Sequence, residues 1–190
     1  MIPFTGRVLC AAFVAASLGH GASAQETSNQ VAVASDWSVF EFPPVCGTEK
    51  AGEECRQQGT KPTECWGITQ PRETVNTRDG QPVSVRRGDI RLFVTFRPGA
   101  PGEISFTGGY PFAEQSTVAV DVDGSAYEMF TDGEWAWPAS PEADATLLAA
   151  MKAGTQATLT ARSGKGTQTK DTFSLRGFTA AMTEAEARCK

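Results

Sequence analysis

The sequence feature that most constrains the fold is the alternation of apolar and polar residues on both sides of Asp123-Gly124. Residues 118–122 place a valine at every second position, and Tyr127 and Met129 continue the alternation after the turn. Such alternation around an Asp-Gly pair is typical of a β-hairpin with one buried face. We therefore predict that the rest of the chain is arranged around an antiparallel hairpin.

Further short strands are predicted on both sides of this hairpin. The clearest is 90–97, in which Leu92, Val94 and Phe96 fall on one face. The other predicted strands are 36–42, 72–78, 82–87, a short one around 104–106, 155–162 and 167–175. Many short strands separated by turns predict an all-β fold, an antiparallel, jelly-roll-like β-sandwich, with a flattened barrel as the near alternative.

Two helices are predicted, one mid-chain and one C-terminal. For 141–153, Ser140 can cap the helix, Pro141 suits its first position and Gly154 its end. The last segment carries apolar residues three or four positions apart, which predicts a helix with one buried face. These residues are Phe178, Ala181, Met182, Ala185 and Cys189.

Residues 1–24 have the pattern of a cleaved secretory signal peptide. Arg7 precedes an apolar run over 8–18, and small residues provide a cleavage site at the end. The apolar run is too short for a helix that spans a bilayer, which needs roughly 20 residues. We expect a flexible lead-in over 25–35, a single domain over 36–190, and export to the periplasm, the outer envelope or the medium.

The composition excludes several classes of chemistry. The only histidine, His20, lies in the predicted signal peptide, so the mature protein would lack the imidazole that catalytic triads and many zinc sites require. The formal net charge is −5 and basic runs are absent, which is unlike a nucleic-acid-binding protein. We expect no cofactor, no metal site, no nucleic-acid partner and no transmembrane segment after signal removal.

Four cysteines follow the predicted signal peptide, and in an exported chain an even number predicts disulfides. Cys46 and Cys55 flank a short polar loop, so we pair them with each other, which leaves Cys65 for Cys189. A zinc site made of all four cysteines is the alternative, but the sequence shows no C-x-x-C spacing. We interpret 43–64 as a surface excursion closed by the first disulfide.

Four aromatic residues fall in predicted connections rather than strands: Tyr110, Phe112, Trp135 and Trp137. Large aromatic side chains in loops can form a binding patch, and they can equally pack into the core beneath the loops. We take these four residues as the candidate binding site and leave both interpretations open.

Three carboxylates on the central hairpin, Asp121, Asp123 and Glu128, could serve a glycan hydrolase if two of them were held beside a cleft. Solvated side chains of an ordinary hairpin are the competing interpretation. Arg87-Gly88-Asp89 spells an adhesion tripeptide, for which we predict a tight turn with Gly88 at positive φ.

Several phrases together resemble the invasion-associated locus B family of exported bacterial proteins. They are Glu64-Cys65-Trp66, PVSVRRGDI (82–90), GEISFTGGYPF (102–112), DGEWAWPAS (132–140), AAMKAG (149–154), KGTQTKDTFSLRGFTAA (165–181) and Cys189. The resemblance implies a periplasmic or envelope-associated β-sandwich protein, named for a role in host-cell invasion. It implies no enzymatic activity and no catalytic residues, and the excursion 43–64 departs from the family pattern.

We therefore predict an exported, disulfide-stabilised, non-enzymatic envelope protein. Its partner would be an envelope or host-surface protein or glycan, bound in host interaction or envelope maintenance. A carboxylate-dependent hydrolase of cell-wall glycan is the alternative.

Overall fold

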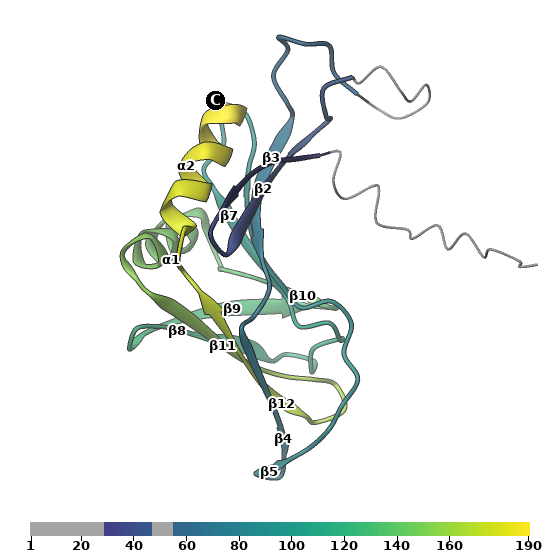
Figure 1. Cartoon of the computed structure of the whole chain (residues 1–190). Helices are drawn as coiled ribbons and strands as arrows, with labels where there is room; N and C mark the ends of the chain where they lie inside the picture. The colour runs from purple at the N-terminus through teal and green to yellow at the C-terminus, as the bar shows by residue number, and fades with distance from the viewer. Residues whose placement is uncertain (1–28, 47–54) are drawn as a thin grey trace, which may run out of the picture.

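The computed structural model describes residues 29–46 and 55–190 (Figure 1). The predicted signal peptide, 1–24, and the first residues of the predicted lead-in lie outside the described residues. Within the described part, most of the regular structure is β-strand, with two helices near the end. The predicted mostly-β composition with one mid-chain and one C-terminal helix is confirmed.

Twelve strands in the described residues form one antiparallel sheet, whose order is β1-β2-β3-β6-β7-β10-β9-β8-β11-β12-β4-β5. The elements are β1 (Gln30–Ala34), β2 (Trp37–Phe42), β3 (Glu64–Thr69), β4 (Glu73–Arg78), β5 (Gln81–Pro82), β6 (Arg91–Phe96), β7 (Glu103–Thr107), β8 (Thr117–Val122), β9 (Ser125–Asp132), β10 (Trp135–Trp137), α1 (Pro141–Ala153), β11 (Gln156–Arg162), β12 (Gln168–Ser174) and α2 (Phe178–Cys189).

The structure shows one open sheet where the sequence predicted two packed sheets. The three-residue strand β10 joins the two groups of strands, because Trp135 pairs with Thr107 of β7 on one side and with Asp132 of β9 on the other. We predicted Trp135 and Trp137 to lie in a connection, which is wrong. A three-residue strand is too short to show a period, so its pairing could not be read from the sequence.

The sheet bends so that strands far apart in its order face each other across the core. The rings of Phe106 in β7 and Phe173 in β12 lie 6.0 Å apart, edge to face. The indole nitrogen of Trp37 in β2 donates a hydrogen bond of 2.9 Å to the carbonyl of Ser174, at the end of β12. All four residues are buried or nearly so, and the core lies inside this bend.

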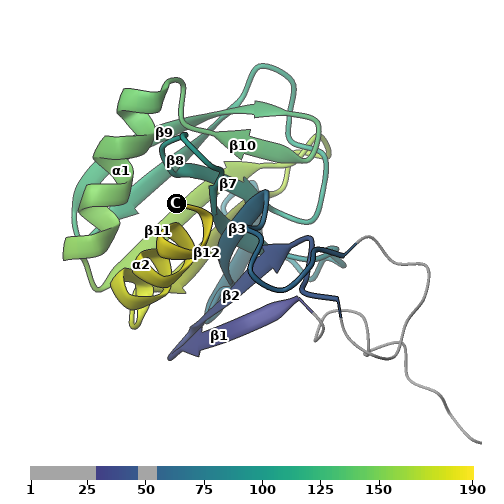
Figure 2. The ribbon, with the colours of Figure 1, turned by 90° about the horizontal axis from the view of Figure 1, so that it is seen from above.

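The helix α2 covers the inner side of β2 and β3, with α1 beside it (Figure 2). Its five buried residues are Phe178, Ala181, Met182, Ala185 and Cys189, as the spacing predicted. Gly67 of β3 permits this close packing, because a Cβ there would lie 2.1 Å from the terminal carbon of Met182. The close packing of α2 on β3 therefore depends on the absence of a side chain at Gly67.

The helix α1 has the predicted bounds and the predicted cap. Ser140 Oγ accepts a hydrogen bond of 3.2 Å from the Ala143 amide. Asp144 Oδ1 accepts one of 2.7 Å from the Ile104 amide, which ties the helix to β7. Burial raises the pKa of Asp144.

Two local predictions are wrong. The second half of the expected lead-in, Gln30–Ala34, forms the edge strand β1, which pairs with β2. The expected strand 82–87 shortens to Gln81–Pro82, and beyond it the Val83 amide bonds to the carbonyl of Asn76. In both places the observed strand pairs with the strand next to it in sequence, β1 with β2 and β5 with β4.

Candidate binding surface

Tyr110 and Phe112 do not belong to an exposed patch. Phe112 is 7% exposed and packs on Phe106, with ring centroids 6.0 Å apart. Tyr110 packs edge-on against Phe112 and shares a hydrogen bond with the hydroxyl of Thr169. Burial raises the pKa of Tyr110. For these two residues the structure supports core packing beneath the loops.

Tyr110 also contacts a buried ion pair between the connection before β6 and strand β12. Arg87 binds both carboxylate oxygens of Asp171, at 2.7 and 2.6 Å, and its Nε donates to the carbonyl of Gly108 at 2.8 Å. The two side chains are 7% and 0% exposed. Burial raises the pKa of Asp171, and the Arg87 guanidinium opposes this rise.

The buried ion pair changes the interpretation of the adhesion tripeptide. Arg87 is committed to Asp171 inside the fold and is not presented to a receptor. Gly88 does not have a positive φ, so that prediction is wrong. It is Gly109 that lies at φ 72°, where a Cβ would stand 2.6 Å from the Gly88 carbonyl oxygen. Gly88 therefore lies where its backbone and the backbone of Gly109 approach each other closely.

Trp135 and Trp137 lie on the outer side of β10, facing away from the core. Trp135 is 40% exposed and Trp137 is half-buried. Their ring centroids are 6.5 Å apart with planes inclined by 25°. The intervening Ala136 is fully buried, which follows from the alternation of side chains along a strand.

Four further aromatic residues extend this pair across the sheet. Phe130 of β9, 46% exposed, lies 5.6 Å from Trp137, and Phe93 of β6 lies 5.7 Å from Trp135. On the next strands, the rings of Phe40 and Trp66 stack at 5.7 Å. The six residues form what we call the aromatic face: Phe40, Trp66, Phe93, Phe130, Trp135 and Trp137.

The aromatic face spans six neighbouring strands, from β2 to β9. At about 4.8 Å between strands, the span is about 24 Å. Both helices pack on the inner side of the sheet, so no described helix covers these rings. Sequence reasoning missed four of the six residues. The available signal was that each alternates with buried neighbours, which marks an outward position.

Acidic side chains border the aromatic face at its β9–β10 end. Glu128, Asp132 and Glu134 are all exposed, and Asp132 pairs in register with Trp135. Two of the six rings, Phe130 and Trp135, are exposed, and the other four are partly buried. An apolar row with exposed members and a charged border is typical of an interaction site.

A model of the family described as "Invasion associated locus B (IalB) protein" matches residues 53–186. The match covers more than half of the chain and includes five of the six residues of the aromatic face. The chain belongs to the IalB family. The crystal structure of invasion associated protein b from Bartonella henselae is similar, at 18% sequence identity and a TM-score of 0.49, over 82% of this chain and 95% of that chain. No curated protein matches the sequence.

Both predicted disulfides of this IalB protein are confirmed, Cys46–Cys55 and Cys65–Cys189. Two disulfides indicate an oxidising compartment outside the cytoplasm. In the described part of the chain, no helix has the length and apolar character that crossing a bilayer requires.

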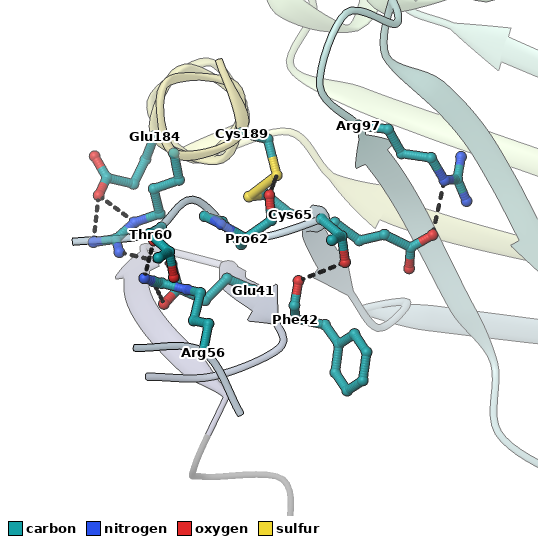
Figure 3. Close-up of a disulfide and its surroundings, with 12 residues drawn as sticks. Glu41, Phe42, Arg56, Thr60, Pro62, Cys65, Arg97, Glu184 and Cys189 are labelled. Atoms are coloured by element: carbon teal, nitrogen blue, oxygen red, sulfur yellow. Dashed lines mark hydrogen bonds and ion pairs between the residues drawn. A yellow bond between two sulfur atoms is a disulfide. The ribbon is translucent and has the colours of Figure 1, made fainter. Parts of the chain in front are cut away.

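An ion-pair cluster lies beside the Cys65–Cys189 disulfide (Figure 3). The buried carboxylate of Glu41 binds Arg56 on one side and Arg188, at 3.1 Å, on the other. The cluster links β2, the residues after Cys55 and the end of α2. The described part of the excursion is therefore anchored to the domain, while 47–54 lie outside the described residues.

The three carboxylates of the central hairpin have local hydrogen-bond partners. Asp123 accepts from the Thr155 amide at 2.6 Å, and Asp121 accepts from the Gly124 amide at 3.1 Å. Glu128 accepts from the hydroxyl of Thr117 at 3.0 Å. The hydrogen bonds from Thr155 lower the pKa of Asp123. The contacts of Asp121 and Glu128 lie within the hairpin, whereas Asp123 links the hairpin turn to the residue before β11.

Proposed function

We propose that this IalB-family chain is an exported envelope protein that acts by binding, and that its partner is a protein that docks on the aromatic face. The sequence left a protein and a glycan partner open, in host interaction or in envelope maintenance. The observation that carries the proposal is the exposure of Trp135 and Phe130 in a row of six rings on the side of the sheet opposite the helices.

The arrangement of the rings favours a protein over a glycan at this surface. A sugar ring binds best to an aromatic face that is free to receive it. Here the neighbouring rings lie against one another: Phe40 and Trp66 are inclined by only 9°, and Trp135 and Trp137 by 25°. Apolar side chains of a partner protein can pack on such a row without needing a free ring face.

The acidic side chains that border the aromatic face indicate the charge of the partner's surface. Because Glu128, Asp132 and Glu134 are exposed beside the rings, the complementary surface is an apolar patch flanked by Lys or Arg. Attraction between border charges raises the association rate and is screened by salt. Binding at the aromatic face should therefore weaken as salt is added.

The test is chemical cross-linking of the protein in its native envelope, followed by binding measurements with the captured partner. Replacing Trp135 and Trp137 by alanine removes one exposed ring and its half-buried neighbour on β10. Hot-spot residues of this kind contribute about 2 kcal/mol or more, so affinity should fall at least about thirtyfold. The matched control is Val75→Ala, which removes another exposed apolar side chain from the outer face, on β4.

Circular dichroism and thermal unfolding show whether the double variant is folded. Asp132→Lys with Glu134→Lys is a second variant that leaves the rings in place and should slow association. A folded Trp135/Trp137 double variant that binds the same partner with unchanged affinity would contradict the proposal. Recovery of a glycan in place of a protein would reverse our choice between the two partners.

A further inference from the structure

A second, chemically different region lies on the outer face, over strands β4, β12, β11 and β8. It contains two hollows, of about 410 Å³ and about 240 Å³. Small-molecule sites measure roughly 300–1,000 Å³, so the larger hollow is of a size that can hold a ligand. We call the two hollows together the threonine trough.

The strand register explains why the lining is regular. Rows of outward side chains run across the four strands, because paired residues of neighbouring strands lie side by side. One row is Val75, Lys170, Thr160 and Ala119; the next is Glu73, Thr172, Thr158 and Asp121. Along a third, Thr77, Gln168 and Arg162 are paired. The trough is thus lined by five threonines, two glutamines and four charged side chains, with three apolar side chains among them.

Three threonines of the trough have hydrogen-bond partners: Thr158 and Thr172 bond to each other at 3.4 Å, and Thr117 donates to Glu128 at 3.0 Å. Other polar side chains of the trough have none. In the described residues, the side chains of Thr160, Gln156 and Gln168 make no hydrogen bond, and those of Arg162 and Lys170 make no ion pair. A hollow lined by free donors and acceptors is suited to a ligand that offers both.

The charges of the trough balance. Each hollow is lined by one cation and one carboxylate, Arg162 with Asp79 in the larger and Lys170 with Glu73 in the smaller. The Asp121 carboxylate, at the end of one row, lines neither hollow and accepts a hydrogen bond from the Gly124 amide. A polyanion would meet the two carboxylates, and a polycation would meet the two cations, so neither gains a net attraction. An uncharged ligand with many hydroxyl groups is repelled by neither the carboxylates nor the cations.

We propose that the threonine trough binds a neutral glycan chain, whose hydroxyl and amide groups exchange hydrogen bonds with Thr160, Gln168 and their neighbours. This site is separate from the aromatic face and does not depend on the function proposed for it. A threonine-rich outer strand face alone would not carry the inference, because Thr favours strands in general. The hollow shape together with the uncommitted polar groups carries it.

The test is an NMR titration of the ¹⁵N-labelled protein with three soluble probes. Two probes are neutral, the N-acetylglucosamine tetramer and maltohexaose, and the third is an anionic oligogalacturonate. At least one neutral probe should shift amide signals of β4, β8, β11 and β12, with an affinity that is the same at low and high salt. Absence of shifts with both neutral probes, or shifts with oligogalacturonate alone, would overturn the proposal.

Variants locate the site. Thr160→Val with Gln168→Leu removes hydrogen-bonding groups at similar volume and should weaken the neutral glycan about tenfold, as expected for the loss of one or two hydrogen bonds. The control is Thr95→Val, the same change on the outer side of β6, beyond the trough; it should have no effect. Equal weakening by the control, or none by the double variant, would contradict the assignment.

The Trp135→Ala and Trp137→Ala changes should leave glycan binding intact. Failure of the aromatic-face proposal is therefore distinguishable from failure of this one. Loss of the glycan response in that variant would show that the glycan lies on the aromatic face, and would overturn the placement in the trough.

Discussion

The aromatic face and the threonine trough occupy the same side of one sheet, yet their chemistry is opposite. Six aromatic rings line the outer positions of one part, whereas hydroxyl and amide groups line those of the other. The inner positions of both parts are alike, since Val94 and Leu159 are equally buried. Packing in the core constrains the inner residues of both parts. The chemical difference between the two parts therefore lies at the outward positions.

The two regions also differ in which observation points to a binding site. Exposed aromatic residues are unusual in themselves, because a contiguous apolar surface is unfavourable in water unless a partner covers it. Outward threonines are common on solvated strands. At the trough the informative observation is therefore the hollow and its unpaired polar groups, which only the folded structure reveals.

The largest expected effect concerns Asp171, on the inner side of the strand that carries the trough. Asp171→Asn leaves the buried cation of Arg87 without its counter-charge, which should lower the free energy of unfolding by about 3–5 kcal/mol. Urea denaturation measures the change. Lys170→Gln alters the adjacent outward residue and should cost less than about 0.5 kcal/mol. Similar values for the two variants would refute the contrast between inner and outer positions.

A smaller effect is expected on the inner side of the aromatic part. Gly67→Ala forces Met182 to move, and overpacking of this kind costs about 1–3 kcal/mol. Gly164→Ala is the matched change near the trough, where the nearest atom would be 3.7 Å away, an ordinary contact. Thermal unfolding of both variants checks the difference. A stable Gly67→Ala protein would show that α2 can shift away from β3 without cost.

The smallest effect concerns the turn between β8 and β9, where the two parts meet. Hydrogen bonds from Thr155 hold the pKa of Asp123 below its ordinary value. The carboxylate therefore stabilises the fold fully above its unfolded-state pKa, and this contribution is lost as pH falls through the folded-state pKa. Asp123→Asn should lower the melting temperature at neutral pH.

That difference from the unmodified protein should vanish in strong acid, where Asp123 is protonated in both states. Melting temperatures measured over a pH series test the prediction. Asp132→Asn changes an exposed carboxylate of β9 and serves as the control. A difference that persists unchanged into strong acid would show that the hydrogen bonds to Asp123 do not depend on its charge.

The sequence predicted the features that depend on local periodicity. The cap at Ser140, the buried stripe that ends at Cys189, and the pairing of Cys65 with Cys189 all follow from short-range spacing and from the count of cysteines. The alternation of 90–97 also predicted the buried side of β6. The cap, the stripe and the alternation need only a few residues of context, whereas the Cys65–Cys189 pairing followed by elimination once Cys46 was paired with Cys55.

What could not be predicted depends on which strands become neighbours. The role of Trp135 follows from pairing with both Thr107 and Asp132, and no local pattern shows this. The aromatic face places Phe40 and Phe130 on the same side of the sheet, although their strands, β2 and β9, are far apart in sequence. Tyr110 and Phe112 were candidates because they lie in a connection, but the bend of the sheet turns that connection inward.

The Cys65–Cys189 disulfide also has a mechanical consequence. It joins residues 124 positions apart, so β3 to β12 and both helices lie within a covalently closed loop. If tension is applied between the segment before Cys65 and the residue after Cys189, the force passes through the sulfur–sulfur bond and bypasses the strands between. The aromatic face keeps five of its six rings inside the closed loop, and only Phe40 lies on the segment that bears the load.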